Sequence, residues 1–183
     1  MKLRIKNTRL TILILAYYQI IGGIIGLYLI TKILFKTQSL NGALLFIFLS
    51  AIGLYFLSIK SGSLLIRKEN KRGLIYSMIH QLIQIIGIGF GGNTFVYYSG
   101  AKFTVGPNFT DGIHFKFDLG LLSQFDMSFN LNEKSYFLYV NILALFILYV
   151  FWDLYKELIL VKNNPDISLV EKKQNELNDE YVI

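Results

Sequence analysis

The feature that most constrains this chain is an uncharged run of 21 residues, Leu10–Ile30, which lies between Arg9 and Lys32. In a helix such a run is roughly 30 Å long, the thickness of the hydrocarbon core of a bilayer. The whole sequence is 54% hydrophobic and only 16% charged, which is unusual for a soluble domain. We therefore predict a transmembrane helix at residues 10–30.

Three further apolar segments resemble the first. Residues 42–59 contain no charged side chain, residues 73–92 follow a basic pair, and residues 135–161 carry aromatic side chains near both ends. Aromatic and basic residues at the ends of apolar segments are typical of membrane interfaces. The sequence therefore predicts an all-α membrane bundle of four transmembrane helices, the first three of them within residues 1–92.

The basic residues are distributed unequally between the two ends of these segments. Thirteen of the 18 Lys and Arg residues fall on the side that holds both termini and the connection between the second and third helices. The positive-inside rule places that side in the cytoplasm. We expect a multi-pass protein of a bacterial inner (plasma) membrane with both termini cytoplasmic, and a disordered cytoplasmic tail at 162–183.

The remaining loop, residues 93–134, is expected outside the membrane. Apolar and polar residues alternate at 113–119 and 124–131, and more weakly at 95–105, as they do in half-buried strands. Gly106-Pro107-Asn108 and Asp111-Gly112 are turn sequences. We predict a three-stranded antiparallel meander in this extracytoplasmic loop.

One face of that small sheet is apolar and is too large for the sheet to bury alone. It could cover the helix ends, lie on the lipid surface or bind a partner protein in the membrane or periplasm. The G-x-x-x-G pair in the first helix could likewise make an internal contact, or a contact with a partner or a second copy of the chain. The partner-binding candidates are Ile113, Phe115, Phe117, Leu119, Phe125, Met127, Phe129, Gly22 and Gly26.

Polar residues inside the predicted spans form a second candidate site. Four of them follow helical spacing on the third segment, and two others lie at a similar depth on the first and fourth. A polar stripe that faced lipid would be costly. We interpret the cluster either as interhelical hydrogen bonding or as a hydrated, proton-sensitive pocket centred on His80. Its members are Ser77, His80, Gln81, Gln84, Gln19 and Asn141.

No catalytic, cofactor or metal site is expected. The chain has no cysteine, and a single intramembrane histidine lacks the further ligands that a metal ion needs. Residues 87–92 match G-x-G-x-x-G, but without the strand–turn–helix context of a nucleotide site. Asp153 and Glu157 are interpreted as solvated or ion-paired rather than catalytic. The net charge of +6 is assigned to lipid headgroups, not to nucleic acid.

These observations favour a non-enzymatic integral membrane accessory subunit that binds another membrane or periplasmic protein. A small transporter or channel component that uses the polar stripe of the third helix is the alternative. An intramembrane enzyme is a third hypothesis, but the sequence offers no pair of nucleophile and base to support it.

Overall fold

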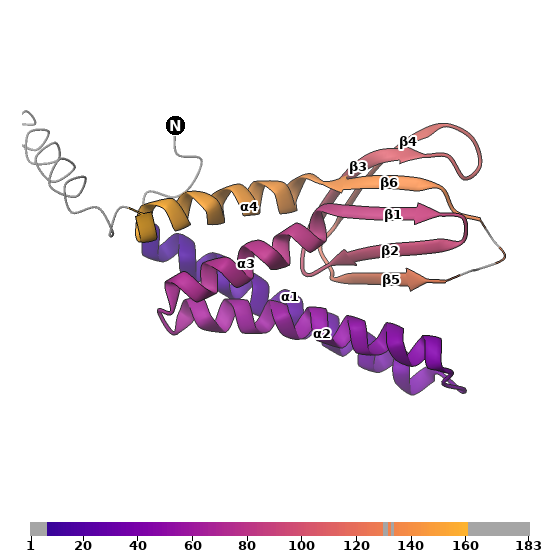
Figure 1. Ribbon diagram of the computed structural model, residues 1–183, viewed down its shortest axis with the longest axis horizontal. Coiled ribbons are helices and arrows are strands. Elements are labelled where there is room, and N and C mark those ends of the chain that lie inside the picture. The colour runs from indigo at the N-terminus through magenta and orange to yellow at the C-terminus, as the bar shows by residue number, and fades with distance from the viewer. Residues whose placement is uncertain (1–6, 130–131, 133, 161–183) are drawn as a thin grey trace, which may run out of the picture.

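The computed structural model describes residues 7–129, 132 and 134–160 (Figure 1). The predicted tail at 162–183 lies outside these residues. The elements of the described part are α1 (Thr8–Lys36), α2 (Gly42–Ile66), α3 (Asn70–Ile85), β1 (Ile86–Phe90), β2 (Asn93–Tyr98), β3 (Lys102–Asn108), β4 (His114–Gly120), β5 (Gln124–Ser128), β6 (Phe137–Asn141), α4 (Ile142–Tyr155) and a π-helical turn (Lys156–Leu160).

The predicted all-α bundle of four transmembrane helices is wrong. Within the described residues, six strands form one antiparallel sheet in the order β4-β3-β6-β1-β2-β5. Of the helices in the described part of the chain, only α1 and α2 are long and apolar enough to cross a membrane. Helices α3 and α4 have 16 and 14 residues, because the segments predicted as the third and fourth spans change from helix to strand along their length.

The change from α3 to β1 has a local cause. Ile86–Phe90 reads Ile-Gly-Ile-Gly-Phe, and glycine disfavours a helix while alternation favours a strand. Gly87 and Gly89 lie against the side chains of Tyr98 and Phe137, so a Cβ at either position would clash. No linker separates α3 from β1, or β6 from α4.

The predicted three-stranded meander is also wrong in its pairing. β3 pairs with β4 as a hairpin, but β5 pairs with β2 instead of β4. β6, predicted as the start of a helix, lies in the middle of the sheet between β3 and β1. Each central strand therefore has a partner far away in the sequence.

Helices α1 and α2 form a closely packed antiparallel pair. Asn7 and Asn41 cap their first turns, since each side-chain Oδ1 accepts a hydrogen bond from a backbone N–H three residues later. A Cβ at Gly23 would lie 2.8 Å from the carbonyl oxygen of Tyr55, and one at Gly62 would lie 2.5 Å from that of Ala16. Small residues thus allow the close approach of the two backbones.

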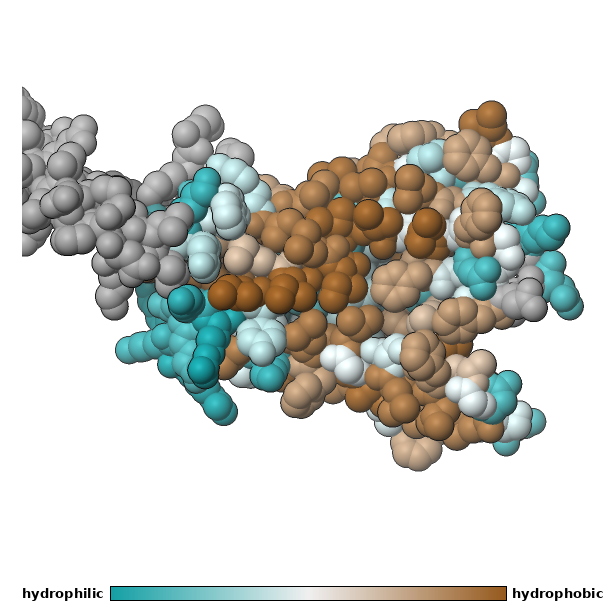
Figure 2. All heavy atoms as spheres, viewed as in Figure 1, coloured by the Kyte–Doolittle hydropathy of each residue, from teal (hydrophilic) through white to brown (hydrophobic). Residues whose placement is uncertain are grey.

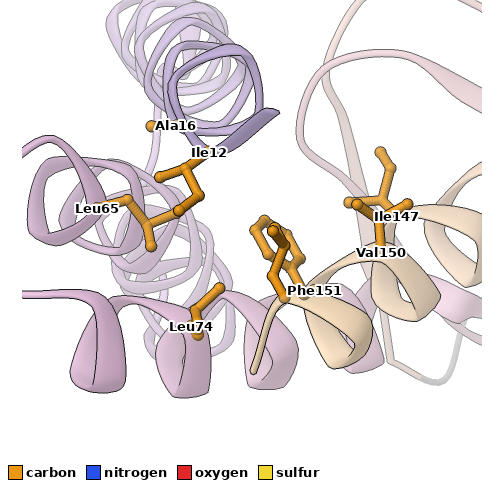
Figure 3. Close-up of a cluster of buried hydrophobic side chains, with 8 residues drawn as sticks. Ile12, Ala16, Leu65, Leu74, Ile147, Val150 and Phe151 are labelled. Carbon is orange, nitrogen blue, oxygen red and sulfur yellow. The ribbon is translucent and has the colours of Figure 1, made fainter. Parts of the chain in front are cut away.

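A buried apolar cluster joins all four helices near one end of the helix layer (Figure 3). The four helix ends that meet there are the start of α1, the end of α2, the start of α3 and the end of α4 (Figure 1). We call this group the basal cluster, because it lies at one end of the helix layer. Basic residues lie near its members in the sequence. It consists of Ile12, Ala16, Leu65, Leu74, Ile147, Val150, Phe151 and Leu154.

Many large apolar side chains lie on the outer faces of the helices, and several small or polar side chains lie inside. On α3, Ile75, Ile79 and Leu82 are exposed, whereas the four residues of the predicted polar stripe are buried: Ser77, His80, Gln81 and Gln84. On α1 the exposed residues recur every three or four positions: Leu10, Ile14, Tyr17, Ile21, Ile24 and Tyr28. A helix in water shows the opposite arrangement. Figure 2 shows hydrophobic residues over the middle of the molecule and hydrophilic residues near its two ends.

The sheet has one apolar and one polar face. At the β2 and β5 side the apolar face packs against α1 and α2, where Tyr97 and Phe125 meet Tyr55 and Ile30. Toward β4 the same face is uncovered. The polar face carries residues such as Lys102.

Candidate functional site

The structure buries all six residues of the predicted polar cluster, and each is at most 1% exposed. Asn141 lies apart from the others at the end of β6, where its Oδ1 accepts from the backbone N–H of Phe103 and from that of Ala144 at the start of α4. It therefore caps α4 and ties it to β3. Gln84 is hydrogen-bonded to a part of the sheet that the sequence did not place among the helices.

That part is the turn between β2 and β3. The backbone N–H of Ser99 donates to Gln84 Oε1 at 2.6 Å. The Ser58 hydroxyl donates to the carbonyl of Gln19 at 2.8 Å, so it accepts from the Ser99 hydroxyl at 2.9 Å. Gly100, the next residue, has φ +91°, which favours glycine. The turn thus enters the helix layer and satisfies its polar groups there.

A second turn of the sheet reaches the same place. Ser123 lies between β4 and β5, and its hydroxyl accepts from the N–H of Gly100 at 2.9 Å and donates to the carbonyl of Gly22 at 2.7 Å. Through these hydrogen bonds α1 is held to the turn that carries Ser123, and α2 and α3 are held to the turn that carries Ser99. We call this group the turn junction, defined as Gln19, Gly22, Ser58, Gln84, Ser99, Gly100 and Ser123.

His80 extends the turn junction toward the apolar face of the sheet. Tyr97 donates its hydroxyl proton to the carbonyl of Leu54 at 2.9 Å, so it accepts from His80 Nε2 at 2.9 Å. His80 Nδ1 is then the acceptor for Gln84 Nε2 at 3.2 Å. Burial, with a smaller effect of Tyr55, raises the pKa of Tyr97 and keeps its hydroxyl a donor. Both ring nitrogens of His80 are thus used with neutral partners.

The hydrogen bonds of this arrangement hold parts of the chain in position. Ser77 donates to Gln19 Oε1 at 3.1 Å, and the contacts described for the junction contain amides, hydroxyls and one imidazole but no carboxylate. Among the described residues, no group of three His, Cys, Asp or Glu could hold a metal ion. Glu157, at the far end of α4, accepts from the Thr8 hydroxyl at 2.6 Å. The turn junction fixes the sheet on the helices.

The partner-binding candidates divide into two groups. Phe125 and Met127 lie on β5, the strand nearest α2, and the ring of Phe129 lies 6.2 Å from that of Phe46. Gly22 and Gly26 contact the turn junction and the Tyr55 ring, so both make internal contacts. The other group is uncovered at β4: Ile113, Phe115, Phe117 and Leu119 are 84%, 63%, 66% and 73% exposed.

The polar face of the sheet holds a pocket of about 310 Å³ that sequence reasoning missed. Lys102 Nζ donates there to Asp118 Oδ2 at 2.5 Å and to Gln124 Oε1 at 2.6 Å. Burial, then the charges of Asp118 and Tyr139, raise the pKa of Tyr98 to about 12. The alternation of polar residues is visible in the sequence. The position of β6 between β3 and β1, which adds Phe137 and Tyr139 to the pocket lining, is not.

No known family, curated protein or solved structure matches this chain. Its function is therefore inferred from the features just described. They comprise two helices suited to a bilayer, a buried junction that fixes the sheet, and an edge strand with exposed apolar side chains.

Proposed function

We propose that this chain is a non-enzymatic membrane subunit, held in the bilayer by α1 and α2, which binds a protein partner through β4. The observation that carries this proposal is the exposure of β4. It is an edge strand of the sheet, and Phe115, Phe117 and Leu119 project from one of its faces with most of their surface exposed. A free edge combined with an apolar face invites a further strand.

A partner strand added to β4 would satisfy both features at once. Its backbone would pair with the free N–H and C=O groups of β4, and its side chains would cover Phe115 and Phe117, whose rings lie 5.4 Å apart. Lys116 and Asp118, on the opposite face, would remain at the polar pocket. This geometry supports recognition by main-chain pairing together with apolar side-chain contacts.

The test is site-specific photo-cross-linking in intact cells. A photoreactive residue at position 117 is expected to cross-link one protein of defined mass, because this position faces the proposed partner. The same residue at position 116, one residue away on the opposite face, is the matched control and should give little of that product. Cross-links to lipid alone from position 117 would contradict the proposal.

A companion variant tests the strength of the contact. Replacing Phe115 and Phe117 together by serine is expected to release the cross-linked partner during purification, since both rings are more than half exposed and add little to the core of the free chain. Membrane insertion and thermal stability should be nearly unchanged. Retention of the partner by the double variant would show that this face does not carry the contact.

We further propose that the basic end of α1 and α2 faces the cytoplasm, as the positive-inside rule requires. The chain lacks cysteine, so single cysteines can report on topology. Ser39→Cys, between α1 and α2, is expected to react with an impermeant thiol reagent in whole cells. Glu69→Cys, at the other end of α2, should react only after lysis.

Both positions are exposed in the structure, so access to the side chain itself is matched. Reaction of both cysteines in whole cells would show that α2 does not cross the membrane. Reversed labelling would overturn the orientation.

A further inference from the structure

A groove runs between α3 and α4 on the outer surface of the helix layer. Its volume is about 570 Å³, within the range of ligand pockets. Two parallel rows of apolar side chains line it, each with helical spacing. From α3 come Ile75, Ile79 and Leu82, and from α4 come Leu145, Tyr149 and Trp152.

One end of the groove lies at a level marked by positive charge. Members of the basal cluster on all four helices lie two or three residues from a basic side chain: Ile12 from Arg9, Leu65 from Arg67, Leu74 from Arg72 and Leu154 from Lys156. Because the cluster packs these helices together, their basic residues gather at one end of the molecule, where Figure 2 shows hydrophilic residues. Such a ring of charge is typical of the headgroup level of a membrane.

Two of these basic residues lie next to the groove-lining residues along their helices. Arg72 lies one turn before Ile75 on α3, and Lys156 lies one turn after Trp152 on α4. Lys156 Nζ is 5.1 Å from the centre of the Trp152 ring, so its charge lies beside the groove wall. Arg72 pairs with Glu69 at 3.6 Å, but both side chains are exposed. An exposed ion pair is weak, so another anion can replace Glu69 at Arg72.

We propose that this groove binds an acyl chain of an anionic phospholipid, with the headgroup at Arg72 and Lys156. The apolar rows extend from the charged end toward the middle of the molecule, which is the path of an acyl chain below its phosphate. A second copy in the same membrane would instead place like charges against each other, which is unfavourable. The site rests on the membrane embedding proposed above, but not on the partner at β4.

Trp152 is the only tryptophan in the sequence, and it lines the groove. Its fluorescence can therefore report on the lipid next to it without any substitution. The protein is reconstituted in phosphatidylcholine vesicles that contain an equal minor fraction of either brominated phosphatidylglycerol or brominated phosphatidylcholine. Bromine on the acyl chains quenches a tryptophan in contact with them. We expect phosphatidylglycerol to quench as if its binding constant were about tenfold higher.

The charged mouth is tested by substitution. Arg72→Gln combined with Lys156→Gln should make the two brominated lipids equivalent, each compared with the same variant in unbrominated vesicles. Lys32→Gln combined with Lys36→Gln removes the same charge at the far end of α1 and should retain the preference. Loss of the preference in both double variants would reduce it to net charge and overturn the site.

Other outcomes of the quenching experiment also decide whether the groove binds an anionic phospholipid. Equal quenching of the unmodified protein by both lipids would mean that Trp152 contacts bulk lipid, and would overturn the site while leaving the proposed function intact. Absence of quenching by either lipid, with a dimer mass from light scattering, would assign the groove to a second copy. Failure of the membrane embedding itself would appear separately, in the labelling of Ser39→Cys and Glu69→Cys.

Discussion

Replacing Gly22 by alanine is expected to destabilise the protein by about 3 kcal/mol or more, because overpacking against fixed atoms is costly. A Cβ at this position would lie 2.7 Å from Gly100 N, 2.8 Å from Ser99 C and 2.9 Å from Ser99 O. All three are backbone atoms of the turn junction, so no side chain can rotate away. The turn would have to leave α1, and the Ser123 bridge would break with it.

Gly53 provides the matched control. It lies in the interior of α2, and a Cβ there would meet nothing within 4 Å. Gly53→Ala is therefore expected to be neutral, or to stabilise the helix by up to about 1 kcal/mol. The free energies of unfolding of both variants can be measured with a denaturant in mild detergent. Equal stability of the two variants would show that the turn does not press on α1.

Replacing Gln84 by leucine should cost about 2–3 kcal/mol, the penalty for leaving buried groups without hydrogen bonds. Its side chain accepts from the Ser99 N–H and donates to His80, and it is 1% exposed. Leucine has a similar size but makes neither bond. The effect should therefore come from the polar groups left behind and not from a change of volume.

Gln81 distinguishes this effect from the general cost of changing a buried glutamine. It lies on the same helix and is equally buried, and its Nε2 has no hydrogen-bond partner among the described residues. Gln81→Leu removes an unsatisfied amide and should be neutral or stabilising. The two substitutions are thus expected to differ in sign or nearly so. A loss of the same size in both would contradict the role of Gln84 in holding the turn.

The parts of the fold that local sequence controls were predictable. The charge-free run at 10–30 lies within α1, which adds two residues at the start and residues 31–36 at the far end. The segment predicted at 42–59 lies within α2. Length, hydropathy and capping all act within one segment, so a pattern in that segment is sufficient.

The helix-to-strand changes were harder to predict. Residues 73–92 contain no Lys, Arg, Asp or Glu, and hydropathy alone does not distinguish a membrane helix from a helix that continues as a buried strand. The period-two pattern of Ile86–Phe90 covers only five residues. The stronger cause lies elsewhere: β1 is held by β2 and β6, and the pairing of Ile86 with Val140 joins residues that are distant in the sequence.

The candidate site was likewise predictable only in part. Helical spacing on α3 identified its buried polar face, but Ser99, which Gln84 of that face binds, and Ser123, which binds Gly100 and Gly22, lie in turns of the sheet. Serine in a turn is ordinary, so no local signal marked these two as buried. Their role follows from the sheet order, which only long-range pairing defines.

The position of β6 also determines the order in which the fold can be completed during synthesis. β6 separates the β3–β4 hairpin from the β1–β2–β5 group, and it is the last of the six described strands to leave the ribosome. Until then the inner edges of β1 and β3 have no partner, and such edges are prone to mispairing. Because α4 follows β6 without a linker, docking of α4 beside α3 and closure of the sheet are parts of one late event. A nascent chain that stalls before residue 137 would hold two half-sheets and would depend on chaperones or on the translocation machinery to keep them apart.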